Sequence, residues 1–311
     1  GGNLIYPNGQ LQEAGGLAWQ DGTTWNVGRL EDPDAPQFNF VRSVDYVSGC
    51  MMATPRQLWN EVGGYDEQFR PLYYEDTDYC FTVRERGYKV YYQPGCEIIH
   101  FEGVSSGVDV TNQNSLKRYQ RVNQDWFKQK WKDALQSHDL VPPAKNLEID
   151  TRLALCGSSA RCPKRALISA PLLPEFDREG GSRRFFHIIQ ILQELGWSVS
   201  VLAANIMGGA RYMEVLTQRG VAVFGGHELY RNPEMLLRAG QFELVISLFW
   251  DHAEPLLPLV REHLPNAKFV VDTIDLHFLR NARRVFSSDE PVLDDAEARE
   301  FRDELNVYYN A

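Results

Sequence analysis

The second half of the chain alternates short apolar runs with amphipathic or polar segments. The apolar runs lie at residues 166–170, 199–203, 221–224, 244–249 and 269–272. Helical patterns separate them, with Ser182 and Asn232 as predicted N-caps and Phe185 and Ile189 among the apolar positions of the first helix. Buried strands that alternate with helices predict a doubly wound parallel α/β sheet.

The first half has a less regular pattern, which predicts a mixed sheet with helices. Strands are expected at 4–6, 41–52, 89–92 and 96–101. Thr54 and Pro55 are expected to start a short helix that Gly63 ends. A second helix is expected at 77–86, and a long amphipathic helix at 114–135. Four side chains of the long helix are expected to face the core: Leu116, Tyr119, Val122 and Trp126.

The change of pattern predicts two domains, at residues 1–137 and 164–311. Residues 138–163 combine a Pro-Pro pair, a Gly-Ser-Ser run and scattered charges, which is typical of an interdomain connection. The chain opens without Met and closes within an expected helix, so we expect a fragment truncated at both ends.

Composition excludes several classes of protein. The 32 basic and 42 acidic residues give a net charge of −10, which argues against a nucleic-acid binder. No apolar run is long enough to cross a bilayer, and no signal peptide is recognised. The five cysteines lack metal-ligand spacing, and their odd number argues against a disulfide framework, so a reducing cytoplasm is the expected compartment.

An acidic stretch at residues 73–80 is the main candidate for chemistry. Glu75, Asp76 and Asp78 follow a turn-forming loop and begin the expected helix at 77–86. Carboxylates in a first helical turn interact favourably with the helix dipole and can cap free N–H groups. Alternatively, one of them is a general base that faces a cleft. The surrounding motifs favour the second interpretation.

Five segments in a fixed order resemble the C-terminal half of a family 2 glycosyltransferase of the GT-A fold. They are YPNGQLQEAGG at 6–16, VSGC at 47–50, GGYDEQF at 63–69, YEDTD at 74–78 and HFEG at 100–103. The resemblance covers residues 1 to about 135. It implies that Asp76 is the general base that takes a proton from the acceptor hydroxyl, and that Glu75 orients or polarises the site. It also implies an inverting reaction with a nucleotide-sugar donor.

The same resemblance implies a divalent metal, Mn or Mg, that stabilises the leaving nucleoside diphosphate. The Asp-x-Asp metal motif of the family is absent upstream. Asp76 and Asp78 spell the same pattern, but their place at a helix start fits the base better than a metal site. His100 is a candidate third metal ligand or a structural residue. Gly49 either shapes the acceptor pocket or allows close packing, and Trp19, Trp25 and Tyr74 either stack on sugars or pack internally.

The second half resembles the N-terminal Rossmann-like domain of a GT-B, family 4 type glycosyltransferase. The segments PEFDREGGS at 174–182 and DTIDLHFLR at 272–280 carry the resemblance. It implies that the loop of Gly180, Gly181 and Ser182 approaches the donor phosphate, although a tight turn explains a bare glycine pair equally well. It also implies that His277 faces the catalytic cleft. Asp272 and Asp275 are either functional or helix caps.

Together these resemblances imply tandem transferase modules that take part in the synthesis of a bacterial surface polysaccharide. The expected partners are a nucleotide sugar and a glycan or lipid-linked acceptor, with no nucleic acid; the residues do not indicate an oligomeric state. The expected location is the cytoplasm, with allowance for peripheral contact with the inner membrane. The alternative is a non-catalytic carbohydrate-binding or scaffold protein. Because both donor sites lack half their walls, we expect this chain alone to be inactive.

Overall fold

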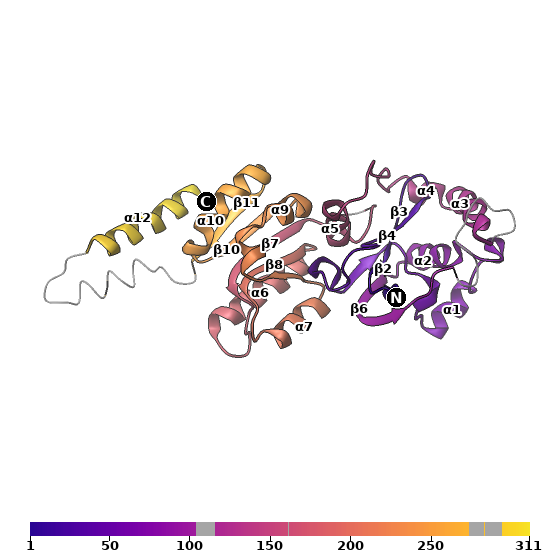
Figure 1. Cartoon of the computed structure of the whole chain (residues 1–311), viewed down its shortest axis with the longest axis horizontal. Coiled ribbons are helices and arrows are strands. Elements are labelled where there is room, and N and C mark those ends of the chain that lie inside the picture. Colours follow the sequence, from indigo (N-terminus) through magenta and orange to yellow (C-terminus); the bar gives the residue numbers. More distant parts are fainter. Residues whose placement is uncertain (104–115, 161, 274–282, 284–293) are drawn as a thin grey trace. The chain divides into compact units, whose positions relative to one another are not determined.

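The computed structural model describes residues 1–103, 116–160, 162–273, 283 and 294–311 (Figure 1). The chain divides into two compact units. One comprises Gly1–Pro163 with Thr217–Gly220, and the other comprises Lys164–Leu216 with Val221–Ala311. Each unit is described separately below.

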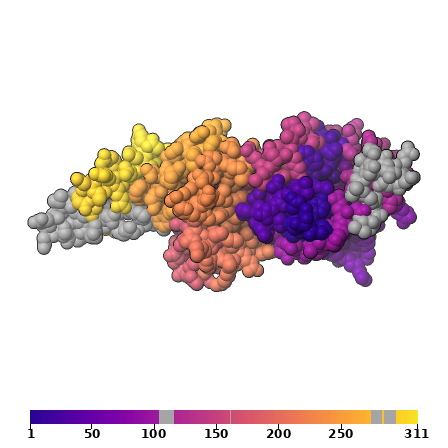
Figure 2. Space-filling model, viewed as in Figure 1, coloured from indigo at the N-terminus to yellow at the C-terminus, as the bar shows by residue number. Residues whose placement is uncertain are grey.

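The first unit is built on a mixed four-stranded sheet. Its spatial order is β2 (Leu11–Glu13), β1 (Gly2–Ile5), β6 (Val90–Ile99) and β5 (Arg42–Val44). Strands β1 and β6 are parallel, and the other neighbours are antiparallel. In the space-filling view, indigo atoms of the N-terminal segment accordingly share one surface with magenta atoms from later in the unit (Figure 2). A separate hairpin pairs β3 (Gly16–Ala18) with β4 (Thr24–Asn26).

Strand β6 corrects the prediction of two strands separated at Pro94. Its partner register on β1 jumps from Gln93 to Glu97, so Pro94 lies in an irregularity of one continuous strand. Proline is tolerated at such a bulge because its missing N–H is not required by the ladder.

Short helices surround this sheet. They are η1 (Pro36–Phe38), η2 (Gly49–Met51), α1 (Arg56–Val62), η3 (Glu67–Phe69), α2 (Glu75–Glu85), η4 (Leu116–Arg118), α3 (Tyr119–Lys130), α4 (Lys132–Leu135) and α5 (Leu147–Cys156). Helix α1 ends at a left-handed Gly63, as expected, but its N-cap is Pro55 without a side-chain bond. The Thr54 hydroxyl instead lies 2.7 Å from the Tyr79 hydroxyl, so the prediction of a Thr54 cap was wrong.

The long helix expected at 114–135 is described only from residue 116 and is divided at Trp131. The expected buried face was also wrong, because Leu116, Val122 and Trp126 are exposed. Phe127 and Leu135 are buried instead. The buried face includes Asn123, whose amide donates to three carbonyl groups, those of Phe69, Leu72 and Tyr73. A polar residue on the buried face makes that face difficult to recognise from the hydrophobicity pattern.

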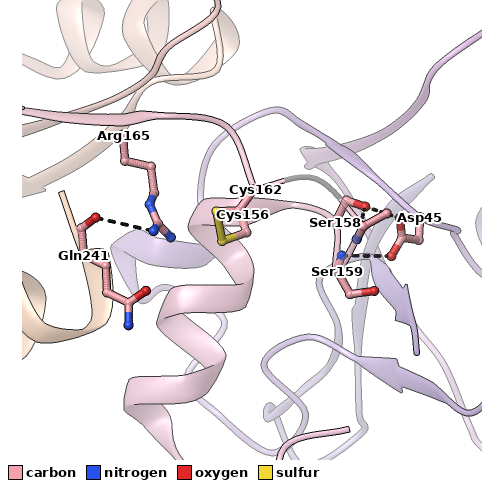
Figure 3. Close-up of a disulfide and its surroundings, with 8 residues drawn as sticks. Asp45, Cys156, Ser158, Ser159, Cys162, Arg165 and Gln241 are labelled. Carbon is pink, nitrogen blue, oxygen red and sulfur yellow. Dashed lines mark hydrogen bonds between the residues drawn. A yellow bond between two sulfur atoms is a disulfide. The ribbon is translucent and has the colours of Figure 1, made fainter. Parts of the chain in front are cut away.

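Residues 138–163, expected as a connection, contain α5 and pack into the first unit. Leu153 and Ala154 of α5 are buried in its main core. Cys156 and Cys162 form a disulfide directly after α5, and the enclosed loop carries Ser158 and Ser159 (Figure 3). The argument against disulfides was therefore wrong. An odd cysteine number does not prevent one local pair, and Cys50, Cys80 and Cys96 are free.

The second unit is a five-stranded sheet in which every neighbouring pair is parallel. Its spatial order is β11 (Lys268–Asp272), β10 (Leu244–Leu248), β7 (Arg165–Leu172), β8 (Ser198–Asn205) and β9 (Ala222–Gly225). The first strand is central and the chain winds outward from it in both directions, which is the doubly wound, Rossmann-like order. The predicted fold class, a mixed α/β unit followed by a parallel doubly wound sheet, is confirmed.

The helices of the second unit follow the predicted pattern closely. They are α6 (Gly180–Glu194), α7 (Ala210–Gln218), α8 (His227–Arg231), α9 (Glu234–Gly240), α10 (Trp250–His263) and α12 (Asp295–Asn310). Phe185 and Ile189 of α6 are buried against the sheet, as the pattern predicted. The caps differ from the prediction, since Glu179 precedes α6 and Pro233 precedes α9. Among the described residues, no helix combines the length and apolar character needed to span a membrane.

Candidate active site

A cavity of about 610 Å3 opens in the first unit. Its walls come from the β2 strand, the β4 strand, the loop at 48–50, the start of α2 and the residues just after β6. The lining residues used below are Gln12, Glu13, Trp25, Ser48, Gly49, Tyr65, Tyr73, Glu75, Asp76 and His100. The cavity thus brings together residues from all five segments that carry the family 2 resemblance.

A strained turn sets the start of α2. Tyr73 and Tyr74 both have left-handed backbones, with φ of 75° and 70°. This conformation is unfavourable for large side chains and persists only where surrounding contacts enforce it. The Tyr74 hydroxyl donates to the Gly22 carbonyl at 3.0 Å, and the Asn123 amide donates to the Tyr73 carbonyl at 2.9 Å. These contacts hold Glu75 and Asp76 at the cavity.

Asp76 is anchored on both carboxylate oxygens. Its Oδ2 accepts from the Gly49 N–H at 2.9 Å, and its Oδ1 accepts from the Thr77 N–H at 2.7 Å. Burial raises the pKa of Asp76, while the bonds from Gly49 and Thr77 oppose that rise. Each oxygen has two lone pairs, and Oδ2 accepts one bond from the protein. Asp76 therefore remains able to accept a proton from a ligand in the cavity.

Glu75 lies beside Asp76 and has a pKa near neutral pH. Burial, followed by the negative charge of Asp76, raises the pKa of Glu75 to about 7. Its Oε2 is buried and accepts no hydrogen bond from any described residue. Burial raises the pKa of Asp76 as well, so both carboxyl groups of the pair keep their protons to a higher pH than free carboxyl groups do.

Glu13 is a third carboxyl group at the cavity. It is 2% exposed, and its Oε1 accepts from the Ser48 N–H at 2.9 Å. Burial raises the pKa of Glu13 to about 8, with a smaller rise from Asp76 and an opposing effect of the Ser48 bond. Glu13 belongs to the motif at 6–16 but was not predicted from the sequence to be a site residue. No local pattern distinguishes it, since a Glu on a short strand is expected on the surface.

Asp78 has a different role from its two neighbours. It is 2% exposed and does not line the cavity. Its carboxylate accepts from Lys130 Nζ at 2.8 Å and from Trp131 Nε1 at 2.7 Å. These bonds tie α2 to the α3–α4 segment. Asp78 therefore does not line the cavity beside Asp76, so the structure gives no support for the Asp76-Thr77-Asp78 pattern as a pair of metal ligands.

His100 does line the cavity, but its surroundings do not complete a metal site. Its Nδ1 lies 3.0 Å from Gln12 Oε1. Within the described ranges, no group of three or more His, Cys, Asp and Glu side chains is placed to hold a metal ion. The described residues therefore do not fit a metal by themselves, and the metal role of His100 stays a prediction.

The aromatic candidates separate into lining and core residues. Trp25 and Tyr74 line the cavity, with Tyr65 and Tyr73, whereas Trp19 is 1% exposed and packs in the core. An aromatic lining suits the apolar face of a sugar ring.

Four of the residues expected to form a site in the second unit, Gly180, Gly181, Ser182 and Asp272, are described and lie at the carboxyl edge of its sheet. Gly180, Gly181 and Ser182 are the first three residues of α6, and the Ser182 hydroxyl donates to the Glu179 carboxylate at 2.7 Å. Asp272, the last residue of β11, forms an ion pair with Arg184. His277 and Asp275 lie outside the described residues. The phosphate role of the glycine pair stays a prediction.

Comparison with known families identifies the class of the first unit. Residues 29–124 match the family described as "Glycosyltransferase like family 2". The first unit therefore contains a glycosyltransferase family 2 domain.

Individual relatives are distant. The chain is 29% identical over 151 residues to the uncharacterised protein y4gI of Sinorhizobium fredii, a match that covers 47% of this chain and 16% of that protein. It is 30% identical over 87 residues to the N-acetylglucosaminyl-diphospho-decaprenol L-rhamnosyltransferase of Mycobacterium tuberculosis, covering 28% of this chain and 26% of the relative. The matches thus span about a sixth and about a quarter of these relatives. No solved structure gives a significant match.

Proposed function

We propose that the first unit takes part in transfer of a sugar from a nucleotide-sugar donor to a hydroxyl group of a glycan or lipid-linked acceptor. One observation carries the proposal. Within a family 2 domain, Glu75 and Asp76 stand side by side at the start of α2, line a cavity and both have raised pKa values. A paired carboxyl site of this kind supports proton abstraction near neutral pH.

Asp76 is the base in this proposal. The acceptor oxygen attacks the anomeric carbon as the bond from that carbon to the nucleoside diphosphate breaks. The hydroxyl proton passes to Asp76, whose orientation is set by the bonds from Gly49 and Thr77. Glu75, with a pKa of about 7, can donate to or accept from the acceptor and so orient it. Attack opposite the leaving group inverts the anomeric carbon. The family resemblance implies a divalent metal, Mn or Mg, for the leaving diphosphate, but the described residues do not complete a site for it.

The substrate class follows from the relatives. The rhamnosyltransferase match supports a deoxyhexosyl donor and a sugar acceptor carried on a lipid diphosphate. We therefore propose a role in bacterial surface polysaccharide synthesis, at the cytoplasmic face of the membrane, and the match to this relative supports it.

The second unit is proposed as a further, GT-B type transferase module. Its Rossmann-like strand order supports this assignment, since such sheets bind ligands at their carboxyl edge. Gly180, Gly181 and Ser182 begin a helix at that edge, where N–H groups can approach a phosphate.

Turnover tests the proposal. The protein that carries this chain, with any flanking sequence, is incubated with a nucleoside-diphosphate rhamnose and polyprenyl-diphospho-N-acetylglucosamine. Release of nucleoside diphosphate that depends on the acceptor and is lost in Asp76→Asn supports it. Equal release by Asp76→Asn contradicts it. Retained glycan affinity with no turnover in the parent protein favours the alternative, a non-catalytic carbohydrate-binding protein.

A further inference from the structure

We propose that Glu13 is a positioning residue of the transferase site, which holds the Ser48–Gly49 segment and thereby fixes the carboxylate of Asp76. The proposal rests on the function proposed above. It assigns a role to a side chain that the family motif around Asp76 does not include.

Two consecutive backbone N–H groups connect the two carboxyl groups. The Ser48 N–H donates to Glu13 Oε1 at 2.9 Å, and the next N–H, that of Gly49, donates to Asp76 Oδ2 at 2.9 Å. Glu13 ends strand β2, whereas Asp76 begins α2. The 48–49 segment is therefore held from two elements, and a shift at Glu13 moves the donor that orients Asp76.

The burial of Glu13 requires an explanation beyond stability. A carboxyl group that is 2% exposed loses its hydration, and among the described residues no Lys, Arg or His forms an ion pair with it. A hydrophobic side chain would fill the same place on β2 at lower cost. The observed acceptor is needed, however, to satisfy the Ser48 N–H at the cavity wall.

The surroundings of Glu13 set its charge. The titratable groups that interact with it electrostatically are Asp76 on α2, the amino group of Gly1, Tyr46, Cys50, Cys80 and Tyr92. Burial raises the pKa of Glu13 to about 8, so the side chain is mostly uncharged at pH 7. An uncharged Glu13 accepts the Ser48 bond without repelling the carboxylate of Asp76. Above pH 8, its ionisation places a second negative charge beside the base.

Two variants separate positioning from charge. In Glu13→Gln, the amide oxygen still accepts from Ser48 and no charge develops, so we expect kcat close to that of the parent at pH 7. We also expect the fall in activity above pH 8 to be reduced. In Glu13→Leu, which is similar in volume but accepts no bond, we expect kcat to fall about tenfold or more with KM nearly unchanged. Full kcat in Glu13→Leu, or equal losses in both variants at pH 7, overturns the proposal.

A second measurement does not depend on turnover. The amide resonances of Ser48 and Gly49 in the 311-residue chain report the two hydrogen bonds directly. We expect both to shift in Glu13→Leu and to stay near their parent positions in Glu13→Gln. An unchanged Gly49 amide in Glu13→Leu overturns the positioning role even if no sugar transfer is found. Shifted amides together with an active Asp76→Asn variant show instead that only the proposed function has failed.

Discussion

The Gly49 N–H donates to Asp76 Oδ2 at 2.9 Å across a separation of 27 residues. This bond joins the first residue of η2 to the first turn of α2. It orients the proposed base from outside its own helix, so the position of Asp76 depends on the loop as well as on α2.

Replacing Asp76 by Asn is expected to lower kcat by about 10² to 10⁴ fold, because the amide cannot take the acceptor proton. The free energy of unfolding should change little, since Asn Oδ1 can still accept one of the two N–H bonds. Steady-state turnover and thermal unfolding measure the two effects. Glu85→Gln, at the exposed end of the same helix, is the matched control and should be active. An active Asp76→Asn enzyme contradicts the assignment of the base.

Replacing Gly49 by Val is expected to impair the site with a smaller effect on stability. A Cβ at this position lies 3.1 Å from the Tyr65 hydroxyl and 3.4 Å from Asp76 Cβ, and the backbone φ is not in the left-handed region. The added methyl groups therefore displace cavity-lining side chains without backbone strain. We expect kcat/KM to fall at least about tenfold. Gly95→Ala, at an exposed position with ordinary contacts, is the control. Unchanged kcat/KM in Gly49→Val excludes Gly49 from the acceptor pocket.

Glu13 predicts a specific dependence of stability on pH. Burial raises the pKa of Glu13 to about 8 in the folded chain, against an ordinary value of 4.5. Between these values the unfolded chain has released a proton that the folded chain retains, so the free energy of unfolding falls as pH rises. Glu13→Gln removes this contribution to the pH dependence of the free energy of unfolding. Its stability relative to the parent should therefore increase from pH 5 to pH 8, by a few kcal/mol at about 1.4 kcal/mol per pKa unit. Denaturant unfolding at both pH values measures it, and a constant difference contradicts the raised pKa.

Asp78→Asn should destabilise the fold and spare the chemistry. The substitution removes the charge that pairs with Lys130 and weakens the acceptor of Trp131 Nε1 at a position that is 2% exposed. We expect a loss of about 2–4 kcal/mol in the free energy of unfolding. The exposed Asp125→Asn on α3 is the control. Turnover per folded molecule should be unchanged; a selective loss of kcat means that Asp78 acts in the site.

Reduction of the Cys156–Cys162 disulfide is expected to lower the melting temperature. For a loop with a sequence separation of 6, the chain-entropy model gives a contribution of about 2 kcal/mol. The enclosed Ser159 N–H donates to the buried Asp45, so the loop supports an internal polar network (Figure 3). Thermal melts with and without dithiothreitol test this in the parent, in Cys156→Ser and in Cys96→Ser. Dithiothreitol should lower the melting temperature of the parent and of Cys96→Ser, but not that of Cys156→Ser. An equal decrease in Cys156→Ser would show that the reductant acts on another group.

The apolar pattern alone was sufficient to predict the second unit. Each buried parallel strand is a continuous apolar run, and α6 presents Phe185 and Ile189 at helical spacing, so local sequence and tertiary environment agree. The acidic stretch was also identifiable, because Glu75 and Asp76 follow turn residues and belong to one of the five segments that resemble family 2 glycosyltransferases. The pairing of strands, the disulfide and the buried face of α3 were not predictable, since they depend on contacts between distant residues such as Asn123 and the carbonyls of the 69–73 loop.

The sequence by itself determined where the strands of the second sheet lie, and it identified the acidic stretch with Glu75 and Asp76 as the candidate for acid–base chemistry. Only the tertiary structure decided what each carboxylate does. Glu13, Asp76 and Asp78 have the same charge in the unfolded chain at neutral pH. Burial raises the pKa of all three, but folding places each one among different donors: Ser48, Gly49 with Thr77, and Lys130 with Trp131.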